Sequence, residues 1–145
     1  MLFRSSRFAV AVHILTLLAS AAEPLPSSLI AGSVGTNPVL IRRLVSQLAE
    51  AGLVSTVMGS NGGAALARAA TSITLLDVFR AVESATLIAP HHSVPNPACM
   101  VGREITGALK HAADRAQAAM DGALAEITIA GMLADVERAA RLRKP

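Results

Sequence analysis

The chain has few aromatic residues and a single cysteine, and both shortages narrow its function. Among its 145 residues are three Phe and neither Trp nor Tyr. Proteins that read RNA or single-stranded DNA usually stack bases on aromatic side chains, so the composition disfavours that class. The one cysteine, Cys99, permits no internal disulfide, which fits a reducing compartment. We therefore expect a cytoplasmic protein.

The sequence also lacks the motifs of the common enzyme classes. It contains no P-loop, no dinucleotide-binding fingerprint and no nucleophile elbow, and its carboxylates are scattered over expected helix faces. We therefore predict that the chain is not an enzyme. Hydrophobic residues make up 52% of it, which suits a folded core, and its net charge of +3 permits a nucleic-acid partner without requiring one.

The N-terminal segment permits two interpretations. Arg4 and Arg7 precede the apolar run 8–18, and Ala19-Ser20-Ala21 matches a signal-peptide cleavage site. The run is too short to cross a bilayer, which takes about 20 apolar residues, so we expect no membrane partner. The alternative is a first helix over residues 5–22, because apolar residues recur there at helical spacing: Phe8, Val12, Leu15 and Ala19. We favour the helix.

Residues 27–68 carry the pattern of two short helices, a tight turn and a hairpin. The first helix is expected from residue 27, and the turn is Gly35-Thr36-Asn37-Pro38. Asn37 is a favoured N-cap, and Pro38 is favourable at the first position of the second helix. Four apolar residues then recur at helical spacing and predict its buried face: Ile41, Leu44, Val45 and Leu48.

A glycine-rich hairpin follows these helices. Residues 53–58 are rich in β-branched side chains, residues 59–63 are Gly-Ser-Asn-Gly-Gly, and residues 64–67 return as a second strand. Helix-turn-helix followed by a hairpin is the order of a winged helix, whose wing lies along the DNA backbone or minor groove. The alternative is a small helical domain with an ordinary hairpin.

The outward face of the second helix opens with two arginines, a feature that suits the major groove. We favour one of Arg42 and Arg43 contacting a base and the other a phosphate; the alternative is that both contact phosphates only. The predicted DNA-binding residues are Ser27, Ser28, Asn37, Val39, Arg42, Arg43, Ser46, Ser60, Asn61, Gly62 and Gly63.

The C-terminal half changes character. Thr74 and Asp77 have the spacing of a capping box and predict a short helix, after which the proline-containing residues 84–101 predict an irregular loop. Residues 103–127 are alanine-rich and helical, and Thr128 is positioned to cap a last helix. A heptad-like stripe on the long helix predicts a dimer interface: Ile105, Leu109, Ala112, Ala116, Ala119 and Ala123. The alternative is packing within one chain.

Several segments, taken together and in order, resemble the Rrf-type winged-helix transcription regulators of bacteria. They are residues 8–13, 37–44, 51–54, 59–63 and 73–78. This family includes the iron–sulfur-assembly repressor, the nitric-oxide-sensing repressor and the cysteine-metabolism repressor. The resemblance covers almost the whole chain. It implies a homodimer, crossed at the long C-terminal helices, that binds a palindromic operator.

Two departures from the family pattern matter. Cluster-binding members carry three cysteines in the loop before the long helix, whereas this chain has only Cys99 there, so we expect no iron–sulfur cluster and no other cofactor. Some relatives place an arginine just before the wing glycine, where this chain has Met58. An apolar side chain cannot exploit the negative potential of the minor groove. Wing contacts would then fall to Asn61 or the wing backbone.

His91, His92 and Cys99 are the only cluster of metal-ligand types in the sequence. Adjacent histidines point apart in an extended chain, so we predict no metal site. Cys99 is a candidate thiol redox sensor; the alternative is an ordinary loop cysteine.

The predicted fold is mainly α with a small β-hairpin. It consists of a winged helix-turn-helix DNA-binding domain at 1–83, an irregular loop with a candidate sensor at 84–101 and a helical dimerisation region at 102–145. The predicted function is sequence-specific binding of double-stranded DNA by a homodimeric regulator, a repressor, on a palindromic operator. Its effector is unknown. The alternative is a winged helix that binds proteins and not DNA.

Overall fold

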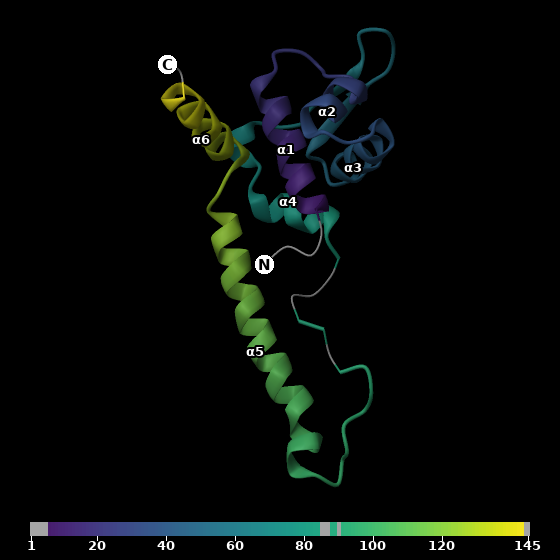
Figure 1. The fold of residues 1–145 in the computed structure, drawn as a ribbon, viewed down its shortest axis with the longest axis vertical. Coiled ribbons are helices and arrows are strands. Elements are labelled where there is room, and N and C mark those ends of the chain that lie inside the picture. The colour runs from purple at the N-terminus through teal and green to yellow at the C-terminus, as the bar shows by residue number, and fades with distance from the viewer. Residues whose placement is uncertain (1–5, 85–87, 90, 144–145) are drawn as a thin grey trace. The chain divides into compact units, whose positions relative to one another are not determined.

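The computed structural model describes residues 6–84, 88–89 and 91–143, and the chain divides into two compact units (Figure 1). The first unit combines the chain up to Glu83 with the chain from Ala125 onward; the second is Ser84–Leu124. Arg4 and residues 85–87 and 90 of the predicted loop lie outside the described residues. The fold is mainly helical with one two-stranded hairpin, as predicted.

Helix α1 (Arg7–Ser20) supplies much of the core of the first unit. Its side chains pack against α2 (Ser27–Val34) on one side and α6 (Ile129–Leu142) on the other. Figure 1 shows α1 between these two helices. Six of its residues are buried: Phe8, Ala11, Val12, Ile14, Leu15 and Leu18. The prediction of a first helix is therefore confirmed.

The turn between α2 and α3 (Pro38–Glu50) forms as its sequence predicts. Gly35 ends α2 with a φ of 79°, in the left-handed region that glycine adopts without a steric penalty. Asn37 caps α3, its side chain accepting a hydrogen bond from the Leu40 amide at 3.0 Å. The predicted buried face is confirmed: Ile41, Leu44, Val45 and Leu48 all lie in the core.

Strands β1 (Val54–Val57) and β2 (Gly63–Leu66) form the predicted antiparallel hairpin, with Val54 opposite Leu66 and Val57 opposite Gly63. Each strand is within one residue of its predicted bounds. A pair of backbone hydrogen bonds also joins Leu25 to Ala64, at 2.9 and 2.8 Å. Leu25 immediately precedes the N-cap residue of α2, so the turn end of the hairpin is attached directly to the start of that helix.

After the one-turn helix η1 (Ala70–Ser72), the predicted capping box opens α4 (Leu75–Val82). The Thr74 hydroxyl accepts from the Asp77 amide at 3.1 Å, and Asp77 accepts from the Thr74 amide at 2.9 Å. On the inner side of α4, Phe79 meets Phe8 edge to face with ring centroids 5.7 Å apart. Both helices therefore contribute to one core.

Helix α6 returns to this core. Thr128 caps it as predicted, accepting from the Gly131 amide at 3.0 Å. Backbone hydrogen bonds from Leu75 to Ile127 at 2.8 Å and from Ile129 to Ile73 at 2.9 Å fix its start beside α4. Residues 102–145, predicted as one helical region, are thus divided: α6 belongs to the first unit because Ile129 is fully buried there.

In the second unit, α5 (Met100–Ala125) is a helix of 26 residues. Just before the helix, the Cys99 amide donates to the Asn96 carbonyl oxygen at 3.3 Å, and that carbonyl lies against Gly102 in the first turn of α5. None of the side chains of α5 is buried. Across the residues that the structure describes, no helix is long and apolar enough to cross a membrane.

Candidate nucleic-acid interface

The solvent face of α3 presents the predicted contact residues together. The helix is amphipathic, so turning its apolar residues into the core leaves one polar side exposed. Val39, with 58% of its surface accessible, begins that side. Arg42, Arg43 and Ser46 continue along it, and all three are exposed. An exposed helix face with two arginines is suited to entering the major groove of DNA.

The start of α2 lies beside this face. The Arg42 guanidinium donates from Nη1 to the Ser27 hydroxyl at 3.5 Å, which brings together predicted residues from both helices. Ser28 is exposed next to Ser27. The N-cap of α2 is Pro26, which makes no side-chain cap; the Leu29 amide donates to the Pro26 carbonyl oxygen at 3.1 Å, so it is the amides of Ser27 and Ser28 that can meet another acceptor. Helix N-termini of this kind bind phosphate well.

The sequence did not predict a second contact that holds α3 in place. Arg7, in the first turn of α1, donates from Nη2 to the Gln47 side-chain oxygen on α3 at 3.1 Å. The two residues are 40 positions apart, so no local pattern could have shown the pairing. Asn37, predicted as a DNA contact, already uses its side-chain oxygen as the cap of α3.

The wing residues divide by exposure. Ser60 and Asn61 are exposed at the turn, whereas Gly62 and Gly63 are half-buried. A Cβ at Gly62 would overlap the Val57 carbonyl oxygen, and one at Gly63 would overlap the Leu25 carbonyl oxygen. The two glycines are therefore required by close backbone packing. Whether they also contact DNA stays a prediction.

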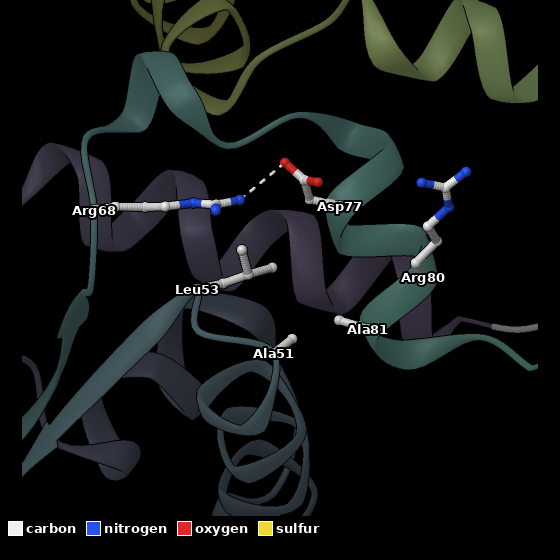
Figure 2. Close-up of a pocket in the computed structure, with 6 residues that line it drawn as sticks. All are labelled: Ala51, Leu53, Arg68, Asp77, Arg80 and Ala81. Atoms are coloured by element: carbon white, nitrogen blue, oxygen red, sulfur yellow. Dashed lines mark hydrogen bonds and ion pairs between the residues drawn. The ribbon is translucent and has the colours of Figure 1, made fainter.

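A small pocket lies on the surface where the end of α3 meets α4. It has a volume of about 250 Å³ and is lined by Ala51, Leu53, Arg68, Asp77, Arg80 and Ala81. Figure 2 shows Arg68 reaching from the segment after β2 to Asp77 on α4, with 3.0 Å between Nη2 and Oδ2. Asp77 is also the residue that completes the capping box of α4. The ion pair therefore connects the segment after the wing to the first turn of α4.

The stripe predicted on α5 is accessible. Ile105 and Leu109 are half-exposed, and Ala112, Ala116, Ala119 and Ala123 are exposed. Cys99 is also exposed, at the position just before α5 begins.

Comparison with known proteins decides the family. The Rrf2 family, described as an iron-dependent transcriptional regulator, matches residues 4–135. The chain belongs to the Rrf2 family. Bacillus subtilis (strain 168) YwnA, an HTH-type transcriptional regulator by its name, is 42% identical over 121 residues, which cover 83% of this chain and 90% of YwnA.

Two solved structures agree with this Rrf2 fold. A crystal structure described as that of a DNA-binding protein is 36% identical, has a TM-score of 0.72 and covers 88% of this chain and 99% of its own. IscR of T. potens is 27% identical, has a TM-score of 0.73 and covers 95% of this chain and 90% of its own. The predicted winged-helix fold is confirmed, and the chain is a transcriptional regulator rather than an enzyme.

The iron implied by the Rrf2 description does not fit the side chains present. An iron–sulfur cluster takes four cysteines, or cysteines together with histidines, and this chain has one cysteine. Within residues 6–84, 88–89 and 91–143, no three His, Cys, Asp or Glu side chains gather in a way that could hold a metal ion. His91 and His92 are exposed in the loop and do not form such a group with Cys99.

Proposed function

We propose that this Rrf2 regulator represses transcription in the cytoplasm as a homodimer that binds a palindromic operator in double-stranded DNA. The observation that carries the proposal is the exposed face of α3, where Arg42 lies against Ser27 at the start of α2. In a helix-turn-helix, the second helix enters the major groove and the first crosses the backbone. On this basis we expect one of the two arginines to contact a base edge and the other a phosphate, with the serines at phosphates.

The homodimer is supported by the exposure of the side chains of α5 in the single chain. Twenty-six residues of helix extend about 39 Å, and in the single chain none of its side chains is buried. An isolated helix is marginal in water unless an apolar face packs against something. A second copy of α5, paired along the stripe from Ile105 to Ala123, would cover that face. The small alanines would allow close approach of the two helices.

The arginine pair gives a direct test of DNA binding. We expect the protein to bind a labelled duplex from the region upstream of its own coding sequence more tightly than a scrambled duplex. The double variant Arg42→Ala, Arg43→Ala should lower the affinity at least about tenfold, because a bidentate arginine–guanine pair contributes about 1–3 kcal/mol. Fluorescence anisotropy at about 150 mM salt, where non-specific binding is already weak, measures both effects.

A charge-matched control separates recognition from general electrostatics. Arg138→Ala with Arg141→Ala removes the same charge from α6, where both arginines are exposed. We expect this variant to keep most of the affinity. If the wild-type protein binds neither duplex even at low salt, the proposal is wrong, and a winged helix that binds proteins becomes the better account.

We also propose that operator binding needs no iron–sulfur cluster, since the donor set for one is missing. Protein purified without oxygen should contain no stoichiometric iron and sulfide, and chelation should leave its duplex affinity unchanged. A loss of affinity on chelation would contradict this. The role of Cys99 as a thiol sensor stays a prediction; its exposure allows peroxide to reach the sulfur.

A further inference from the structure

The wing of this regulator carries no charge. From Ala51 to Ala67 the sequence has no Lys, Arg, Asp or Glu, so the hairpin and the segments on either side of it are neutral. The next cation along the chain, Arg68, is paired with Asp77 (Figure 2). Neutralisation of phosphates is the usual source of affinity for DNA, and this hairpin has no side chain that could provide it.

The same wing exposes an apolar side chain. Met58 follows directly after β1 and has 93% of its surface accessible, more than any other large apolar residue that the structure describes. Val57 beside it is 51% exposed. The remaining residues of the turn are Gly59, Ser60, Asn61 and Gly62, which are small or polar. The turn of this uncharged hairpin therefore exposes one large apolar side chain, the flexible thioether of Met58.

The wing is also held in position relative to the helices proposed to meet DNA. Two backbone hydrogen bonds join Ala64 of β2 to Leu25, two residues before α2 begins. Gly63 packs against the Leu25 carbonyl so closely that no side chain would fit. Figure 1 shows the connecting loop extending past α2, away from the helices. A duplex positioned by the start of α2 would thus meet the wing at a fixed distance.

We propose that the wing binds DNA without a charged group and that Met58, rather than Asn61 or the wing backbone as expected from the sequence, is its principal contact, with its thioether placed in the minor groove. This inference rests on the proposed function. Proteins that bind the minor groove insert apolar side chains, methionine among them, between neighbouring base pairs. The unbranched side chain of methionine adapts to an irregular surface. Affinity gained in this way does not depend on salt.

The test is a salt series with four variants on one probe, a labelled 40-base-pair duplex of mixed sequence. The variants are Met58→Ala, Met58→Lys, Met100→Ala and Met100→Lys. Met100 is the matched control because it is also an exposed methionine, 69% accessible, and lies outside the wing. Affinity is measured by anisotropy between about 50 and 200 mM salt, where phosphate contacts dominate the slope of log K against log salt.

We expect Met58→Ala to weaken binding at least about threefold with an unchanged slope, because only apolar burial is lost. Met58→Lys should steepen the slope by about one for each wing on the duplex, because each lysine adds a phosphate contact. Neither change at Met100 should have these effects. If Met58→Ala binds with wild-type affinity and Met58→Lys shows the wild-type salt slope, the inference about the wing is wrong, while the proposed function still stands. A wild-type protein that binds no duplex would overturn the proposed function as well.

Discussion

At the scale of single residues, Gly63 determines whether the wing stays attached. Its φ of 154° is one that side-chain-bearing residues rarely adopt, and its Cα faces the Leu25 carbonyl oxygen. We expect Gly63→Ala to destabilise the protein by about 1–3 kcal/mol from the backbone conformation alone, with the overlap adding to that. Urea unfolding followed by circular dichroism measures the change.

Gly32 supplies the control for that substitution. It lies within α2 with no atom near its missing Cβ, so Gly32→Ala should stabilise the protein by about 0.5–1 kcal/mol. Equal effects at the two positions would show that the contact between Gly63 and Leu25 does not constrain the hairpin.

Single residues also show what the sequence could predict. The caps of α3 and α4 could be predicted because each involves residues within one helical turn of each other. The cap at Asn37, the proline at position 38 and the capping box of Thr74 and Asp77 all form as expected. The pairing of Arg7 with Gln47 joins residues far apart in the chain. Such a contact depends on how helices pack, and no short pattern encodes it.

At the scale of elements, α6 is the part whose place the sequence left open. Its heptad-like neighbour α5 suggested one continuous C-terminal region, but Ile129 directs α6 into the core of the first unit, where it is fully buried. The backbone bridge between Thr74 and Thr128 completes that attachment. Thr74 and Thr128 are separated in the sequence by the loop and by α5, so no local sequence pattern predicts that they pair.

The attachment of α6 predicts a large loss of stability on Ile129→Ala. Removing a fully buried isoleucine side chain should cost about 2–5 kcal/mol, because both burial and packing are lost. The matched control is Val136→Ala on the same helix, where the side chain is 53% exposed and the cost should stay within about 0.5 kcal/mol. Thermal unfolding of both variants checks this. Similar midpoints would mean that α6 does not contribute to the core.

At the scale of the whole molecule, binding to a palindromic operator requires two copies of the chain. Ala116 lies on the predicted stripe of α5, while Ala118 lies about 200° further around the helix axis. Both are exposed in the single chain, so glutamate is tolerated at either position in a monomer. Ala116→Glu should yield monomers, because two carboxylates would meet in the seam, and Ala118→Glu should remain dimeric.

Sedimentation velocity distinguishes these masses. Dimers from both variants would exclude the stripe as the interface, and a monomeric wild-type protein would exclude the homodimer. The heptad-like stripe on α5 predicted a dimer interface, with packing within one chain as the alternative, and the resemblance to the family implied the same homodimer.

The most direct test of the central claim is selection of bound duplexes from a randomised library, followed by sequencing. A homodimer that reads DNA with α3 should enrich an inverted repeat whose half-sites are centred about 10–10.5 base pairs apart or a multiple of that spacing. The Arg42→Ala, Arg43→Ala variant should lose the enrichment. A wild-type protein that enriches no motif from the library would contradict the account.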